Sequence, residues 1–405
     1  MSDLDIEGMR AMTPGCANRN HLNNAGAALL STVTIAAMTD YLQREALIGG
    51  YEAEAEAADQ IGATYESLAE LIGALPTQIA LFDNSTHAWN AACYSVPLGA
   101  GDRILTGRNE YGSAVLAYLQ LAQRTGAEVV VVPDDDSGQI DVAALADLVD
   151  ERTKMIGLTW VPTAGGLVNP AAEVGRLARA ADVLYLLDAT QVVGQFPIDV
   201  SAIGCDMLTG TGRKFLRGPR GTGFLYVGPR ALDRLDPFVA EIRSATWAGG
   251  RSFTWVDGAR RFETWENSYV NVVGLGAAVR QAIDVGLDRV GRRSAALGAR
   301  LRTGLAEIDG VTVHDLGREK CAIRHRTGGR CGHRRRRGCV VAPGDQRQHH
   351  SRRAQPVRQR GPRCSPNGAA VAALLQHRGG DRPGCRRHQG DRGPPLVCCT
   401  THPQR

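Results

Sequence analysis

The spacing of apolar and polar residues changes near residue 79 of the chain. Before it, residues 34–72 carry apolar side chains at helical spacing among acidic residues, with an interruption at Gly49–Gly50. After it, short apolar runs alternate with helical segments. The runs are RILTG, EVVVVP, KMIGLTW, VLYLLD and GFLYVG, and the segments are 86–97, 113–125, 141–150 and 171–181. This alternation predicts an α/β fold whose mostly parallel sheet is covered by helices on both faces.

The same pattern divides the chain into four parts. Residues 1–20 are expected to form an N-terminal arm and residues 21–265 a large α/β domain. Residues 266–323 read as the start of a small C-terminal α+β domain, with an Arg-rich helical segment at 270–307 and the strands GVTVHDL and CAI. Residues 324–405 follow neither periodicity, so the small domain is predicted to be incomplete.

Composition separates this last part from the rest. The 405 residues carry a formal net charge of +5, yet residues 324–405 hold 19 Arg, no Lys, three Asp and no Glu, a net of +16. The preceding 323 residues therefore carry −11. The tail also lacks Phe, Tyr, Trp, Met and Ile. Such a segment cannot bury enough apolar area to offset its ordering entropy, so we predict that it is disordered.

A change of reading frame accounts for this tail. Of its 82 residues, 70 are types whose codons can begin with G or C, as expected when GC-rich third codon positions are read as first positions. Read in another phase, the codons for residues 368–382 permit the peptide His-Tyr-Tyr-Asn-Thr-Glu-Glu. We therefore place a frameshift close after Ile323. A natural disordered tail, a nucleic-acid-binding arm and a metal-binding segment are the alternatives, but the tail lacks Lys, aromatic residues and paired C-x₂₋₄-C spacing.

Features of a membrane or secreted protein are not found in the sequence. No apolar run reaches the ~18 residues that a membrane span needs. The opening MSDLDIEGMR is acidic where a signal peptide would be basic and then apolar. We expect a cytoplasmic protein that contacts no membrane.

Two charged residues stand next to predicted strands. Asp188 ends the run VLYLLD, and Lys214 lies between the strand DMLTGT and a Gly-rich turn. Ligands of open α/β sheets bind at the carboxyl ends of strands, so Asp188 is placed to meet one. Lys214 is a candidate carbonyl-capturing amine. The alternatives are a helix-capping Asp and a Lys in a basic surface loop.

These residues lie within the motifs D-A-x-Q at 188–191 and T-G-x-K-x-x-x-G-P-x-G at 211–221. Together the motifs resemble those of the class-V aminotransferases, the pyridoxal-phosphate (PLP) family that contains cysteine desulfurases, selenocysteine lyases and isopenicillin N epimerase. The resemblance covers about residues 20–323. It implies a fold-type I PLP-dependent transferase with a seven-stranded-type sheet, PLP as cofactor, a small amino-acid substrate and a homodimer.

The resemblance also implies a role for each matching residue. Lys214 would bind PLP as a Schiff base and move the proton at the substrate Cα, Asp188 would keep the pyridine nitrogen protonated, and Gln191 would bond the phenolic oxygen. The phosphate would lie at the N-terminus of the helix that begins in DNSTHAWNAA. Thr86, His87 and Thr211 would lie near the phosphate, and Asn24 on the substrate side. Three positions depart from the family pattern: Tyr111 stands in the place of a His and would stack on the ring, Arg213 replaces a His and would supply charge to the phosphate, and Thr163 stands where many members have Asn. No metal site is expected.

The motifs leave the reaction open among transamination, C–S cleavage and epimerisation, because all three begin with loss of the Cα proton. A persulfide-forming desulfurase also needs a mobile cysteine. Cys321 lies in the apparent strand REKCAI and is predicted to be a buried structural thiol. An inactive product of a frame-disrupted gene, able to bind PLP without turnover, is the alternative function. A basic-tailed nucleic-acid-binding protein is the second alternative.

Overall fold

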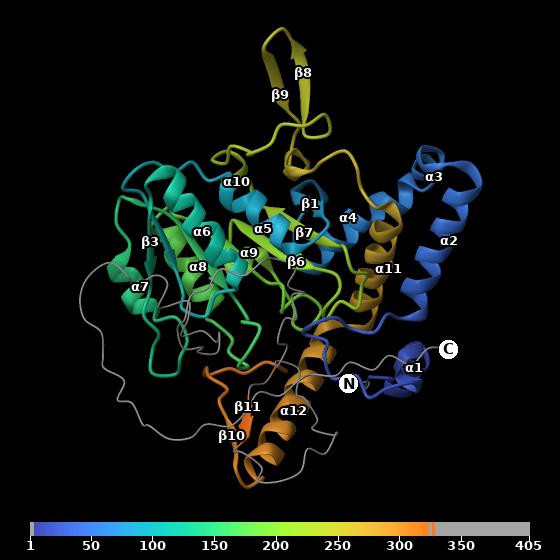
Figure 1. The fold of residues 1–405 in the computed structure, drawn as a ribbon, viewed down its shortest axis with the longest axis vertical. Coiled ribbons are helices and arrows are strands. Elements are labelled where there is room, and N and C mark those ends of the chain that lie inside the picture. The colour runs from blue at the N-terminus through green and yellow to red at the C-terminus, as the bar shows by residue number, and fades with distance from the viewer. Residues whose placement is uncertain (1–3, 324–325, 329–405) are drawn as a thin grey trace, which may run out of the picture.

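The computed structural model describes residues 4–323 and 326–328 and contains a seven-stranded sheet (Figure 1). Its strands are β1 (Ile79–Phe82), β2 (Arg103–Thr106), β3 (Glu128–Val131), β4 (Thr153–Thr159), β5 (Leu184–Asp188), β6 (Met207–Thr211) and β7 (Gly223–Val227). In space they follow the order β1-β7-β6-β5-β4-β2-β3. Strand β7 is antiparallel to both of its neighbours, β1 and β6, and the other neighbouring pairs are parallel. This confirms the mostly parallel sheet.

Helices cover both faces of this sheet, as the alternating pattern predicts. The helices of the large body are α2 (Thr32–Ile48), α3 (Gly50–Glu56), α4 (Ala58–Ile72), α5 (Ser85–Tyr94), α6 (Gly112–Thr125), α7 (Val142–Leu148), α8 (Ala171–Ala180), α9 (Val200–Ile203), α10 (Pro229–Leu232) and α11 (Tyr269–Val285). Successive side chains of β5 enter different cores. Tyr185 and Leu187 pack in the core of α4, α8 and α11, whereas Leu184 and Leu186 pack in that of α5 and α6.

Glycine sets the ends of several helices. The predicted interruption in residues 34–72 is where α2 stops at Gly49, whose φ is +104°, and α3 starts at Gly50. Helices α4 and α6 end at Gly73 and Gly126, both in the left-handed conformation that a glycine adopts without a Cβ penalty.

The predicted helical segment at 270–307 is two helices, not one. It breaks at Gly286, and the axis of α12 (Leu287–Ala306) is turned by 79° from that of α11. Helix α11 packs on α2 and α4, so it belongs to the large body. Helix α12 contacts β10 (Val311–Val313), which is followed in the described chain by β11 (Arg326–Gly328).

The segment after α12 differs from the prediction at two further places. The segment CAI is not a paired strand, since only Lys320 bridges to Leu167, although Cys321 and Ile323 are buried. Strand β11 pairs with β10, so residues 326–328, which the sequence placed in the disordered tail, form a strand. The rest of the tail, 329–405, lies outside the described residues.

Two peripheral elements complete the described chain. The N-terminal arm contains α1 (Ile6–Ala11) and a short 3₁₀ turn at Pro14–Ala17. A hairpin that the sequence analysis did not predict, β8 (Ala245–Gly249) and β9 (Ser252–Trp255), projects from the body at the end opposite α12 (Figure 1). Within the described ranges, no single helix is long and apolar enough to cross a membrane, and only the bent α11–α12 pair passes by length and composition.

The start of α5 depends on the glycine that opens β7. A Cβ on Gly223 would lie 2.7 Å from the Ser85 backbone nitrogen and would also meet the Asn84 carbonyl carbon. We expect Gly223→Ala to lower the free energy of unfolding by about 1–3 kcal/mol, because the helix start must move to admit the methyl group. Urea unfolding followed by circular dichroism measures this loss.

Gly62→Ala is the matched control for that substitution. Gly62 lies inside α4, and a Cβ there would meet nothing within 4 Å. Alanine is the better helix former, so this variant should gain up to about 1 kcal/mol. Equal losses in both variants would contradict the close approach of β7 and α5.

Candidate active site

A pocket opens where three neighbouring strands end. Thr159, Asp188 and Thr211 are the last residues of β4, β5 and β6, and all three line it. The pocket holds about 580 Å³ of space, including the part open to solvent, which is in the range of small-molecule sites. Its other lining residues are Asn84, Ser85, Thr86, Trp89, Tyr111, Ser113, Ala114, Val161, Thr163, Thr190, Gln191, Arg213 and Lys214.

The two charged residues singled out in the sequence meet in this pocket. Asp188 is 8% exposed, and Lys214 is 5% exposed. Burial raises the pKa of Asp188, while Thr190, which donates its N–H at 2.8 Å, and the Lys214 charge oppose that shift. Burial lowers the pKa of Lys214 to about 8, with Asp188 raising it and Arg213 lowering it. A sizeable fraction of Lys214 is therefore the neutral, nucleophilic amine near pH 8.

The N-terminus of α5 forms another wall. Asn84 caps the helix by accepting the His87 N–H at 2.8 Å, and the hydroxyl groups of Ser85 and Thr190 lie 2.5 Å apart. The first N–H groups of a helix have no partner within it, and the helix dipole adds partial positive charge. This wall, with Thr86 in it, is suited to an anion such as a phosphate.

A segment from the start of the chain packs against the site. Gln191 donates through Nε2 to the Ala25 carbonyl at 3.2 Å, and Arg213 donates to the Gly26 carbonyl. The Ala28 N–H in turn donates to the Arg213 carbonyl at 2.8 Å. Gln191 is 2% exposed, and its Oε1 has no hydrogen-bond partner among the described residues. The pocket therefore offers a buried amide that a bound ligand can satisfy.

The structure brings most of the predicted site residues together. The eight that line the pocket are Thr86, Tyr111, Thr163, Asp188, Gln191, Thr211, Arg213 and Lys214. The hydroxyl of Thr211 donates to the Thr222 carbonyl at 2.8 Å, so it can donate to a ligand only by giving up that bond.

Two predicted residues lie elsewhere. The His87 ring bonds Asp83 through Nδ1 at 2.9 Å and lines a second hollow beside Phe82 and Phe238. The His87 side chain therefore lies on a different side of α5 from the side chain of Thr86, which lines the pocket. Asn24 is exposed and does not line it, and the contacts come instead from the backbone of the following residues.

Sequence reasoning missed several residues at the site. Thr159 and Ser113 line it, and so does Trp89, one helical turn beyond Thr86. The buried carboxyl of Glu110 accepts bonds from Thr159 just behind the pocket wall. Thr159 could have been found by the strand-end rule that identified Asp188, since it ends the run KMIGLT. No group of three or more metal-ligating side chains occurs in the part of the chain that the structure describes.

Known proteins share both the sequence and the fold. The model of the family described as aminotransferase class-V matches residues 20–325. A probable cysteine desulfurase of Methanothermobacter thermautotrophicus is 28% identical over 314 residues, 77% of this chain and 78% of that protein. A cysteine desulfurase of Yersinia pestis is 31% identical over 273 residues, 66% of each chain.

Solved structures support the same assignment. An apo cysteine desulfurase from Thermococcus onnurineus superposes with a TM-score of 0.74 at 22% identity, covering 81% of this chain and 83% of that one. The cystine C–S lyase C-DES, in complex with its product cysteine persulfide, gives 0.72 at 25% identity, covering 78% and 86%. The match over three quarters of the sequence, together with the strand-end pocket, shows that the chain belongs to the class-V aminotransferase family of PLP-dependent enzymes.

Proposed function

We propose that this PLP-dependent protein cleaves the C–S bond of a small sulfur-containing amino acid. The observation that carries the proposal is the burial of Lys214 and Asp188 in one pocket that no described cysteine lines. Both curated relatives above carry the name cysteine desulfurase, and C-DES is named as a cystine C–S lyase. Transamination and epimerisation are the competing outcomes.

The residues of the pocket fit PLP. Asp188 offers a buried carboxylate to a protonated ring nitrogen, and the α5 N-terminus with Thr86 offers N–H groups to a phosphate. The unpartnered amide oxygen of Gln191 is satisfied only by a group that enters the pocket. When bound, PLP supplies an electron sink for negative charge at the substrate Cα.

We assign the proton movements to residues of this chain. Lys214 has its pKa near 8, so its amine can take a proton from the substrate Cα and return it. Asp188 holds the proton at the ring nitrogen, because a buried carboxylate stabilises a cation beside it. Arg213, Thr211, Tyr111 and Thr163 line the same pocket. We assign Arg213 and Thr211 to the phosphate, and Tyr111 and Thr163 to the ring and the substrate.

The cysteines favour a lyase over a persulfide relay. Cys321 is fully buried, and burial raises the pKa of its thiol to about 11. Cys93 and Cys205 are also buried, and burial raises the pKa of each thiol well above its ordinary value. A relay needs an accessible thiolate, which none of these three provides. The fourth described cysteine, Cys16, is half-buried in the N-terminal arm and does not line the pocket.

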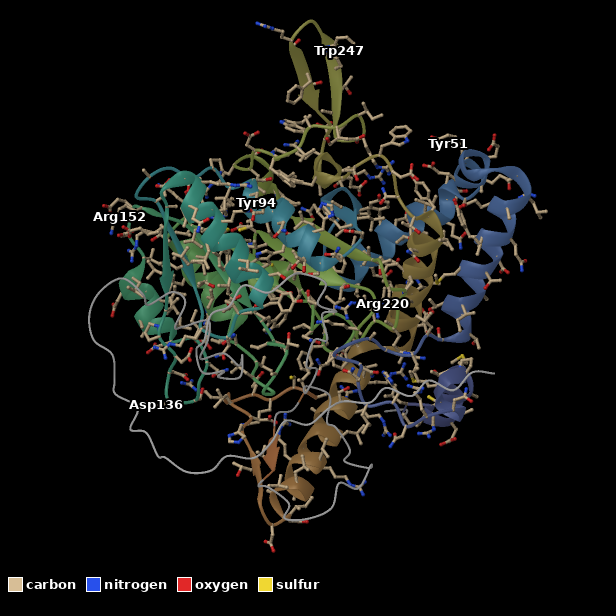
Figure 2. The ribbon with its side chains drawn as sticks, viewed as in Figure 1. Tyr51, Tyr94, Asp136, Arg152, Arg220 and Trp247 are labelled. Carbon is tan, nitrogen blue, oxygen red and sulfur yellow. The ribbon has the colours of Figure 1, made fainter. Side chains whose placement is uncertain are left out.

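A homodimer in the cytoplasm is part of the proposal. The β8–β9 hairpin carries Trp247, 77% exposed, and Phe253, 49% exposed, and Figure 2 shows Trp247 held well away from the body. Phe238 and Ile242 are exposed at its base. Apolar side chains gathered on a projection are typical of a surface that a second subunit covers.

We further infer that the frame of the gene breaks close after Ile323. The family match ends at residue 325, and the matches leave 22% and 34% of the two curated relatives without a counterpart. The tail composition changes at the same point. A chain in this form keeps Lys214 and Asp188 in the pocket, so we expect it to capture PLP. The C–S cleavage proposed above then belongs to the chain with the frame restored after codon 323, and the inactive alternative applies to the 405-residue product.

Capture of the cofactor tests the role of Lys214. We expect the rate at which the apo protein binds PLP covalently to rise with pH through about 8, since only the neutral amine attacks a carbonyl. Asp188→Asn should move this midpoint to lower pH by removing the charge that raises the pKa of Lys214. The visible absorbance of the bound cofactor follows the reaction.

Two variants control this experiment. Lys214→Ala should abolish the absorbance, and Lys154→Ala, which removes a surface lysine paired with Asp102, should leave it unchanged. An unchanged band in Lys214→Ala would disprove the assignment.

Products separate the candidate reactions. A chain with the frame restored after codon 323 should convert cysteine to pyruvate, ammonia and sulfide, and the 405-residue chain should do so at least about 100-fold more slowly, since a misplaced substrate costs that much. Chromatography of the products gives both rates. Alanine in place of pyruvate would indicate a desulfurase, and equal rates for the two chains would contradict the frame break, as would an intact frame in the coding DNA.

A further inference from the structure

A second buried carboxyl lies directly behind the pocket. Glu110 is 9% exposed and comes just before Tyr111, the N-cap of α6. Its Oε1 accepts the Thr159 backbone N–H at 3.0 Å, and its Oε2 accepts the Thr159 hydroxyl at 2.7 Å. Glu110 does not line the pocket itself, so any effect on a ligand passes through its neighbours.

Thr159 connects this carboxyl to two pocket residues. Its Oγ1 accepts the Tyr111 N–H at 3.3 Å, which completes a chain from the Tyr111 backbone through the hydroxyl to Glu110. Thr159 is also the register partner of Asp188 across β4 and β5. The next residue, Trp160, donates its N–H to the Asp188 carbonyl at 3.0 Å. Through these bonds Glu110 holds the carboxyl end of β4, which pairs with the end of β5 at Asp188.

The charge surroundings of Glu110 differ from those of the other buried carboxylates. Glu263 is paired with Arg243 at 2.9 Å, and Asp206 with Arg230 at 2.5 Å. The hydrogen bonds that the structure gives Glu110 come from uncharged groups of Thr159 and Gly107. The titratable groups that act on it or feel its charge are Asp188 and Tyr185 of β5 and Tyr118 of α6, with Lys214 beyond Asp188.

We propose that Glu110 is a positioning residue of the PLP pocket, which fixes Tyr111 through Thr159 and couples its own protonation to the charge on Asp188. Two carboxylates that share a buried site resist being ionised together. Asp188 keeps the charge more readily, because Thr190 donates a hydrogen bond to it and the positive charge of Lys214 acts on it. The proposal builds on PLP binding and does not depend on which substrate bond is cleaved.

Burial raises the pKa of Glu110 to about 7, so the coupling acts near neutral pH. Above that pH Glu110 is ionised, and the chain from Tyr111 through Thr159 ends on a charged acceptor, which strengthens both hydrogen bonds. Below it the proton sits on the carboxyl, and the added negative charge beside Asp188 is gone. Protonation of Glu110 therefore changes both the hydrogen-bond chain to Tyr111 and the negative charge near Asp188.

Spectra of the PLP-loaded protein test both the coupling to the charge on Asp188 and the positioning of Tyr111. The absorbance of bound PLP, titrated with alkali, should show a component with a midpoint near 7 in the wild type. Glu110→Gln should lose it, and Glu110→Asp should keep a component because it keeps the charge. The induced circular dichroism of bound PLP reports how the cofactor is oriented in the pocket. It should weaken in Glu110→Asp and Thr159→Val, because both substitutions break the hydrogen-bond link to Tyr111. It should persist in Glu110→Gln.

Unfolding of the apo protein tests the ionisation of Glu110 in the absence of the cofactor. The folded state keeps the Glu110 proton up to about pH 7, whereas an unfolded glutamate loses it near 4.3, so the wild type should lose stability between these values. Its urea midpoint should fall relative to that of Glu110→Gln from pH 5 to pH 8. An unchanged difference between the two midpoints would show that the pKa of folded Glu110 is not raised, and this would overturn the proposal even if PLP loading failed.

Glu263→Gln is the matched control, since it removes a buried carboxylate bonded to Tyr65 and Arg243 instead of to the pocket wall. It should lower the urea midpoint but leave the titration component and the dichroism unchanged. If Glu110→Gln retains the component near pH 7, or if the Glu110 and Thr159 variants change only stability, then Glu110 supports the fold alone and the proposal is wrong. Absence of PLP binding in every variant, wild type included, would instead refute cofactor capture by this chain.

Discussion

The site depends on the burial of one carboxyl and one amine at the same edge of the sheet. Asp188 and Lys214 both lose water on folding. Hydrogen bonds from Thr190 do most to stabilise the charged form of Asp188, and the Lys214 charge adds to them, while Asp188 stabilises the charged form of Lys214. As a result the pKa of Lys214 is about 8, and the Asp188 carboxyl lies in the same pocket. The strand ends of β5 and β6 fix the two backbones, so the geometry follows from the register of the parallel sheet.

Much of the fold follows from periodicity because parallel strands are buried on both faces. The runs KMIGLTW and VLYLLD became β4 and β5 within a residue or two, and the Gly49–Gly50 break appeared as predicted. The β8–β9 hairpin was missed, because its aromatic side chains are exposed and the sheet-core pattern does not describe them. The bend at Gly286 was missed because helical spacing continues across it.

The pocket residues that lie in sequence motifs could be predicted. Those whose burial or direction depends on packing against other residues could not. Asp188 and Lys214 were identified by their places after strands. His87 was misplaced because a motif does not state which face of a helix a residue occupies. Glu110 escaped notice because a charged residue in a loop usually lies in solvent, and only the packing of Thr159 against it reveals its burial.

The segment that carries Ala25 and Gly26 reaches the site from the opposite end of the large body's sequence. Its partners, Gln191 and Arg213, follow it by 166 and 187 residues. During synthesis this segment leaves the ribosome first but has no place to bind until those partners emerge. This part of the pocket wall therefore cannot form until those partners have been synthesised, and the N-terminal segment stays without its final contacts throughout that interval.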